Sequence, residues 1–183
     1  MEHLGTMYIE TDRLILRRFT MNDAEAMYRN WASDSDVTKY LTWPAHQSVD
    51  ITRMVLSDWS SNYKNDHFYQ WAIVLKENGE EPIGSIAVVS FDDDVQKAHI
   101  GYCIGKKWWH RGITSEALCA VIDFLFDDVG VQRIEARHDP KNPNSGAVMK
   151  KCGMKYEGTL RRSDINNLGL CDACYYGILK EER

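Results

Sequence analysis

The chain has 183 residues, of which 44% are hydrophobic and 27% charged, and its formal net charge is −5. This length suits one α/β domain, residues 1–183, with enough apolar residues to fill a core, which excludes a wholly disordered chain. The negative charge argues against general binding to nucleic acid or to membranes. No apolar run approaches the ~20 residues of a membrane span, and residues 1–6 lack the apolar stretch of a signal peptide, which predicts a cytoplasmic protein.

The first half of the chain predicts one strand, two helices and three further strands, from alternation and from helical spacing of apolar residues. They are a strand at 13–19, a helix through 24–27 capped by Thr20 or Asn22, a helix at 49–63, and strands at 69–76, 83–91 and 98–104. The turns at 78–79 and 92–94 are short, so the three later strands are expected to form antiparallel hairpins.

In the second half the apolar residues change to helical spacing at Thr114, and Gly130 ends the pattern. The predicted elements are a helix at 114–129, a strand at 133–138, a short helix capped by Asn144 or Ser145 and stopped at Gly153, and strands at 154–161 and 171–179. The order β-α-α-β-β-β-α-β-α-β-β predicts an α/β architecture with a mixed sheet and helices on its faces.

The five cysteines do not have the spacing of a disulfide framework, and their number is odd. Cys171 and Cys174 form a C-x-x-C pattern inside a predicted strand, where residues three apart point to opposite faces. No second C-x-x-C and no H-x-x-x-H accompanies it. We therefore expect reduced thiols and no metal site.

Residues 104–116 run from the end of a strand through a basic loop into the start of a helix. The first N–H groups of a helix have no internal partner, and the helix dipole favours negative charge there. Gly112 lets the backbone approach a phosphate closely, while Lys106, Lys107 and Arg111 add positive charge. The stretch predicts a pyrophosphate site, with an ordinary strand–loop–helix junction as the alternative.

This stretch resembles the coenzyme A loop of the GNAT superfamily of N-acetyltransferases, whose pattern is Q/R-x-x-G-x-G/A. Here it reads Trp109-His110-Arg111-Gly112-Ile113-Thr114, so that Trp109 and Thr114 depart from the pattern. A tryptophan at the first position, followed by Glu116-Ala117, is similar to the RimJ/RimL-like branch of the superfamily.

Other segments resemble the same branch, in the same order, between residues 8 and 181. They are residues 10–17, 100–102, 142–145, 151–154 and 172–179. The resemblance implies a GNAT fold, with a mixed, mostly antiparallel sheet of about seven strands and four helices that splays between its fourth and fifth strands.

The resemblance also implies how acetyl-CoA is bound. Backbone groups of Cys103 and Ile104 would pair with the amides of the pantetheine arm, as a missing strand would. The loop from Trp109, with the amides from His110 to Ser115, would surround the pyrophosphate. The Asn142 side chain would contact the cofactor arm, although a turn residue before Pro143 is the alternative role. The expected cofactor-binding residues are Cys103, Ile104, Trp109, His110, Arg111, Gly112, Ile113, Thr114, Ser115 and Asn142.

Two residues are candidates for the chemistry. Asp164 matches an acidic residue proposed as the general base in the RimL-like branch, with a solvated turn residue as the alternative. Ser145 matches the serine of the N-x-x-S segment and could donate a hydrogen bond to the leaving thiolate, besides capping a helix. Many GNAT enzymes use a tyrosine four residues later, but Met149 stands there and cannot donate a proton. His99 is titratable, and a structural role is the favoured interpretation.

The resemblance implies acetylation of a primary amine, and the first interpretation is a protein N-terminal α-amino group, such as that of a ribosomal protein. An α-amine with a pKa near ~7.7–8.0 needs only a weak base. Acetylation of a small amine (an antibiotic, a polyamine or an amino-acid derivative) and a non-catalytic acetyl-CoA sensor are the alternatives. We expect acetyl-CoA as cosubstrate, no metal, and no nucleic-acid or membrane partner, with a homodimer as the candidate oligomeric state.

Overall fold

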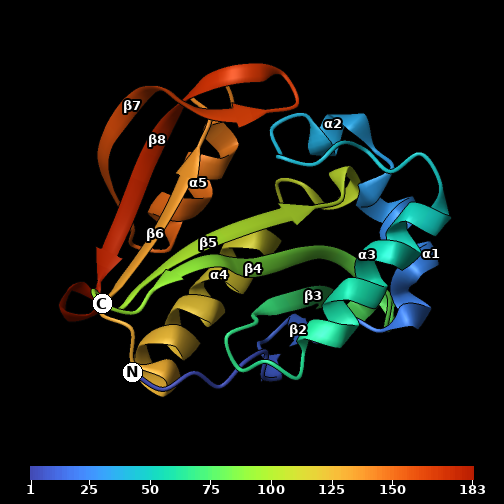
Figure 1. Ribbon diagram of the computed structural model, residues 1–183, viewed down its shortest axis with the longest axis horizontal. Helices are drawn as coiled ribbons and strands as arrows, with labels where there is room; N and C mark the ends of the chain where they lie inside the picture. The colour runs from blue at the N-terminus through green and yellow to red at the C-terminus, as the bar shows by residue number, and fades with distance from the viewer.

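One mixed sheet of eight strands organises the chain, in the order β1-β2-β3-β4-β5-β6-β8-β7 (Figure 1). The computed structural model describes residues 1–183. All neighbouring strands are antiparallel except β5 and β6, which run parallel. None of the helices combines the length and the hydropathy that crossing a bilayer requires.

The strands are β1 (Ile9–Glu10), β2 (Leu14–Arg17), β3 (Gln70–Leu75), β4 (Pro82–Asp92), β5 (Lys97–Ile104), β6 (Arg133–His138), β7 (Lys155–Asn166) and β8 (Gly169–Leu179). The α-helices are α1 (Ala24–Met27), α2 (Ser35–Thr38), α3 (Val49–Asn62), α4 (Ile113–Phe124) and α5 (Pro143–Lys151). A turn of π-helix continues α1 over Tyr28–Ala32 and another continues α4 over Leu125–Val129.

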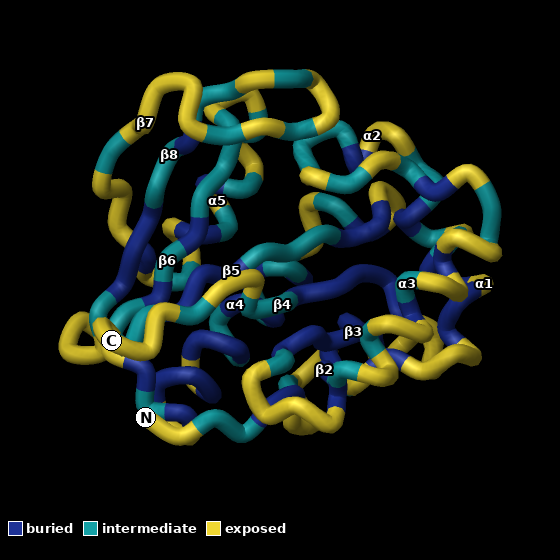
Figure 2. Tube along the Cα trace, in the orientation of Figure 1, coloured by how far each residue is buried: buried dark blue, intermediate teal, exposed yellow.

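The sheet separates two hydrophobic cores, because successive side chains of a strand point to opposite faces. Helices α4 and α5 cover one face, in a core of 28 buried residues that includes Trp71 and Ile73 of β3. Helices α1 and α3 cover the other face, in a core of nine that includes Ala72 between them. Strand β3 is therefore buried along its whole length and is dark blue throughout in Figure 2.

The predicted GNAT fold is confirmed. The sheet has eight strands where about seven were expected, and the chain has five α-helices where four were expected. The extra strand β1 has only two residues and pairs with β2, so it is too short to show alternation. The extra helix α2 is a single turn, and the Asp34 carboxylate caps it by accepting from the Asp36 N–H.

The cap of α5 lies two residues before the predicted Asn144 and three before Ser145. Asn142 occupies the N-cap position, and Pro143 stands at the first helical position, where its missing N–H is no loss. The last hairpin is also longer than expected, since β7 continues to Asn166. Strand β7 lies at the edge of the sheet and is largely exposed (Figure 2), so it lacks the apolar alternation that would mark its end.

Candidate active site

Strands β5 and β6 part after three residue pairs, as Figure 1 shows. Their ladder joins residues 97–99 to residues 133–135, and residues 100–104 have no strand partner on that side. This is the expected splay between the fourth and fifth strands of the prediction. The unpaired N–H and C=O groups of β5 form a short free edge, to which an extended amide chain can bind as a further strand would.

The loop after β5 is held in place by two tryptophans. The indole of Trp108 is buried, and Trp109 Nε1 donates to the carbonyl oxygen of Ile104 at 2.9 Å. Gly105 is required where the loop leaves the strand, since a Cβ there would overlap the Asn30 carbonyl oxygen and lie 2.7 Å from the Trp108 ring. The departure from Gln or Arg at position 109 thus provides a hydrogen bond that fixes the loop to the end of β5.

Two residues with positive φ turn the chain into α4. His110 has a φ of 60° and Gly112, the N-cap of α4, has a φ of 72°. Only glycine adopts this left-handed conformation without strain from a Cβ. The first intrahelical bond of the turn is from Glu116 N–H to Gly112 O, so the N–H groups of residues 113–115 have no helical acceptor. The structure thus presents a cluster of free donors at the positive end of a helix.

Two cations that sequence reasoning missed lie beside Gly112. A Cβ at Gly112 would be 3.3 Å from Lys151 Nζ and 3.6 Å from Arg13 Nη2. Glu116 holds Arg13 there through an ion pair of 2.6 Å, whereas Lys151 makes no ion pair. Arg13 lies immediately before β2, and its approach to α4 depends on tertiary packing, so no pattern near residue 112 could have identified it.

The three loop cations predicted from the sequence, Lys106, Lys107 and Arg111, contact other parts of the protein. Lys106 pairs with Asp36 of α2, and Arg111 pairs with Glu77. Lys107 lies over the ring of Trp108, 5.4 Å from its centroid. These side chains are exposed, so their ion pairs are weak and can exchange for a bound anion.

Ser145 meets a tyrosine on the face of β5 that α4 and α5 cover. The Tyr102 hydroxyl donates to the backbone carbonyl of Ser145, and its oxygen lies 3.0 Å from Ser145 Oγ. Burial raises the pKa of the Tyr102 phenol, and the hydrogen bond from Ser145 offsets only part of that rise. Tyr102 is therefore protonated at neutral pH. The alternation of Ile100, Tyr102 and Ile104 is the sequence signal that could have found it.

Asp164 lies in an ion-paired network on the opposite face of the sheet. Its carboxylate accepts from Arg137 Nε at 2.6 Å and from Arg137 Nη2 at 3.3 Å. Partial burial favours the neutral acid, but the bonds from Arg137 outweigh this and hold the pKa of Asp164 below its usual value. The carboxylate is consequently ionised and only weakly basic.

His99 belongs to the same network. Arg137 Nη1 is 3.3 Å from His99 Nε2, and His99 Nδ1 is 3.3 Å from Glu135 Oε1. A guanidinium can only donate, so Nε2 accepts and the Nδ1–H donates to Glu135. Burial lowers the pKa of His99 despite the neighbouring carboxylate. His99 is therefore a neutral link that orients Arg137, in line with the structural role favoured for it.

The β7–β8 hairpin covers the face of the sheet that holds Asp164 and His99. Asn167, between β7 and β8, donates its N–H to Leu41 O at 3.1 Å. Its side-chain amide donates to Thr38 O at 2.8 Å and to Trp43 O at 2.7 Å. These three bonds tie the hairpin to the segment after α2, which lies beside it in Figure 1.

The residues proposed from the sequence fall into three groups. Cys103 and Ile104 lie on the free edge of β5, with the Cys103 thiol facing Ser85 and its pKa raised by burial. Residues 109–115 form the loop and the open end of α4, while Asn142 stands at the N-cap of α5 with no cap hydrogen bond. Ser145 and Asp164 have no common partner, since one contacts Tyr102 and the other Arg137.

The comparisons with known proteins agree with this geometry. A model of the acetyltransferase (GNAT) domain family matches residues 13–155. An uncharacterized N-acetyltransferase of Bacillus licheniformis, p20, is 32% identical over 182 residues, which cover 98% of each chain. The ribosomal protein uS5 alanine N-acetyltransferase of Escherichia coli is 28% identical over 159 residues, 82% of this chain and 79% of that enzyme.

A solved structure of RimL, a ribosomal L7/L12 α-N-protein acetyltransferase in complex with coenzyme A, has the same fold. Its TM-score is 0.84 at 18% identity, over 97% of this chain and 100% of that one. The family match, the splayed strands and the open end of α4 lead to one conclusion. The chain belongs to the GNAT family and is an N-acetyltransferase that uses acetyl-CoA as its cosubstrate.

Proposed function

We propose that this enzyme acetylates a protein N-terminal α-amino group, by direct attack of the neutral amine on the thioester. The observation that carries the proposal is the weakness of the available bases. Arg137 lowers the pKa of Asp164, and the only free lone pair of the His99 ring accepts from Arg137. Neither group can readily remove a proton from a strongly basic amine.

The free energies favour an α-amine over lysine. Deprotonating an N-terminus at pH 7 costs about 1 kcal/mol, whereas a lysine side chain costs about 4–5 kcal/mol. Asp164, acting through water, is a sufficient acceptor for the first proton and a poor one for the second. The likeness to a ribosomal protein alanine N-acetyltransferase supports a ribosomal N-terminus as the acceptor.

The cofactor roles are assigned within the same proposal. Backbone groups of residues 103–104 bind the pantetheine arm, and the N–H groups of residues 110–115 bind the pyrophosphate. Lys151 and Arg13 neutralise its charge from beside Gly112. Asn142, with its amide free, contacts the arm from the start of α5.

Ser145 and Tyr102 are assigned to the leaving group. The Tyr102 phenol holds a proton that it can turn from the Ser145 carbonyl to Ser145 Oγ, which leaves the Ser145 hydroxyl free to donate to the thiolate that forms when the C–S bond breaks. A hydrogen bond to a charged sulfur stabilises it without a full proton transfer. The pair takes the place of the tyrosine that Met149 replaces.

A panel of acceptors tests the substrate class. Purified enzyme and labelled acetyl-CoA are mixed with one of three acceptors: a lysine-free peptide with a free alanine N-terminus, an N-formylated peptide with an internal lysine, or spermidine. We expect label on the first peptide, mapped to its α-amine by mass spectrometry. The N-formylated peptide is the matched control for reaction at lysine.

Preference for spermidine or for another small amine over the first peptide would refute the N-terminal assignment in favour of a small-molecule acetyltransferase. Binding of acetyl-CoA without transfer to any acceptor, including whole lysate, would instead identify a sensor. The cytoplasmic location and a homodimer stay predictions.

A further inference from the structure

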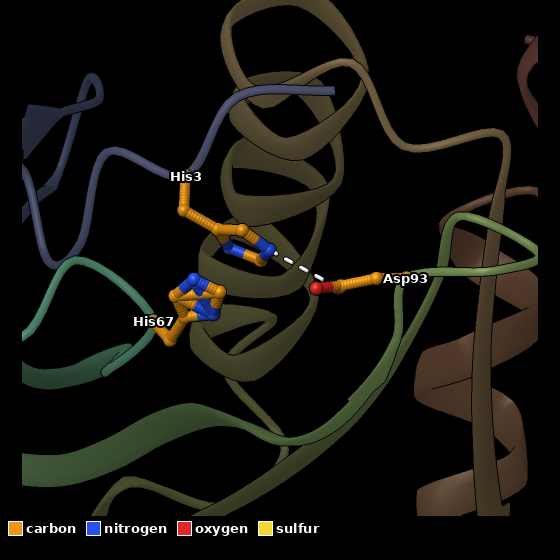
Figure 3. A group of neighbouring side chains, drawn as sticks. All are labelled: His3, His67 and Asp93. Atoms are coloured by element: carbon orange, nitrogen blue, oxygen red, sulfur yellow. Dashed lines mark hydrogen bonds and ion pairs between the residues drawn. The ribbon is translucent and has the colours of Figure 1, made fainter.

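Three residues with metal-ligand side chains meet far from the active site. His3 comes from the N-terminal segment, His67 from the loop between α3 and β3, and Asp93 from the turn between β4 and β5 (Figure 3). One ligand atom of each lies within 4.8 Å of those of the other two. The three residues are distant in sequence, so no spacing motif predicts this group.

His3 is held in position from two sides. Its Nδ1 is 3.2 Å from the Tyr69 hydroxyl, and its Nε2 is 3.2 Å from Asp93 Oδ1. The Leu4 N–H donates to the same tyrosine oxygen at 3.0 Å, and Phe91 packs edge-on against the imidazole. The side chain of His3 is only 10% exposed. A histidine oriented by a partner on its second nitrogen is the arrangement found at protein metal sites.

His67 lies against His3 but is bonded to nothing through its own ring. The two imidazoles stack with centroids 3.8 Å apart and an interplanar angle of 22°. The only hydrogen bond of His67 is from its backbone N–H to Asn65 Oδ1. Its ring is exposed and can turn, and Asp93, 53% exposed, supplies negative charge beside both imidazoles.

We propose that His3, His67 and Asp93 bind a divalent transition-metal ion of the Zn²⁺ class. Two imidazoles and one carboxylate suit such an ion, with water in the fourth position. At ligand distances of about 2.0–2.1 Å, tetrahedral ligands are about 3.3 Å apart. The 3.2 Å between His3 and Asp93 already has this spacing, so only the His67 ring must rotate.

Metal binding selects one tautomer of His3. Binding through Nε2 requires the tautomer with its proton on Nδ1, so a proton that faces Asp93 from Nε2 moves through solvent to Nδ1, and the Tyr69 hydroxyl rotates to accept from the Nδ1–H. A groove of about 800 Å³, lined in part by His67 and Asp93, gives solvent access to the ligand atoms.

The site is separate from the acetyl-transfer site. The turn that holds Asp93 leads into β5, whereas the cofactor loop follows the last residue of this eight-residue strand. A bound ion would join the N-terminal segment to the loop before β3 and to the β4–β5 turn. Its expected effect is therefore on the stability of this end of the sheet, by mass action.

The test uses the full chain, stripped with a chelator and titrated with CoCl₂ and ZnCl₂ by visible absorption and calorimetry. We expect one ion per chain, with cobalt absorption bands typical of nitrogen and oxygen ligands. His67→Ala and Asp93→Asn should each weaken binding by about tenfold or more, and Tyr69→Phe by about 10- to 100-fold. Asp94→Asn, in the same turn, is the matched control and should bind like the wild type.

The zinc-dependent rise in melting temperature should disappear in His67→Ala, while its acetyl-CoA affinity stays unchanged. Binding that persists unaltered in His67→Ala and Asp93→Asn would overturn the proposal. So would a thiolate-to-cobalt absorption band, which would place the ion on the cysteines. Failure of the stripped wild type to bind either ion would do the same.

Discussion

The contact between Tyr102 and Ser145 leads to a sharp kinetic prediction. If the two hydroxyls act together on the leaving thiolate, Tyr102→Phe and Ser145→Ala should each lower kcat, with little change in the KM for acetyl-CoA. A hydrogen bond to a charged group contributes about 1.5–3 kcal/mol, which corresponds to a rate loss of about 10- to 150-fold. In the proposed hydrogen-bond path, Tyr102 supports Ser145 through the 3.0 Å contact between their hydroxyl oxygens, and Ser145 bonds to the thiolate.

The double variant separates a joint role from two independent ones. Because both residues serve one hydrogen-bond path, the loss in Tyr102→Phe/Ser145→Ala should be close to that of the worse single variant. The stability cost is small, since Tyr102→Phe removes two part-buried hydrogen bonds to one residue, about 1–2 kcal/mol together, and lowers the melting temperature by roughly 2–8 °C.

Initial rates at saturating acceptor, followed by release of free coenzyme A thiol, measure these losses, and calorimetry with coenzyme A controls for binding. Wild-type kcat in folded Tyr102→Phe would remove the tyrosine from the path. Losses that multiply in the double variant would show that the two hydroxyls act separately.

Three further predictions concern the cofactor loop, the acid network and the hairpin. Gly112→Glu should abolish acetyl-CoA binding in calorimetry, because the carboxylate would neutralise Lys151 and repel the pyrophosphate; unchanged affinity would disprove this phosphate site. The pKa of Asp164 is lowered in the fold, so its ionised form stabilises the protein fully above the ordinary value of ~3.9 and less as the pH falls toward the folded value. The free energy of unfolding in urea should therefore fall less for Asp164→Asn than for the wild type as the pH drops below about 4. Parallel plots of this free energy against pH would contradict the ion pair with Arg137. Asn167→Ala removes two side-chain hydrogen bonds that hold the hairpin over the face with Asp164, so it should raise the acceptor KM without changing acetyl-CoA affinity. Equal effects on both would mean a general loss of structure.

Local patterns along the chain were enough to predict the architecture and to propose the cofactor loop. Apolar spacing after Thr114 and the stop at Gly130 define α4, and alternation defines the hairpins. Gly112, with its positive φ at the N-cap, marks the turn where backbone donors open toward an anion. The sequence also indicated the catalytic candidates Ser145 and Asp164, but not what surrounds them.

The electrostatics of the site follow from the tertiary packing, because the contacts involved join residues far apart in the chain. Arg13 reaches the loop from the position before β2, and Arg137 makes Asp164 one half of an ion pair. The short elements β1 and α2 could not be predicted from the sequence, for a related reason. An element of one turn or two residues carries no periodic signal, so it forms only where neighbouring strands and caps provide its hydrogen-bond partners.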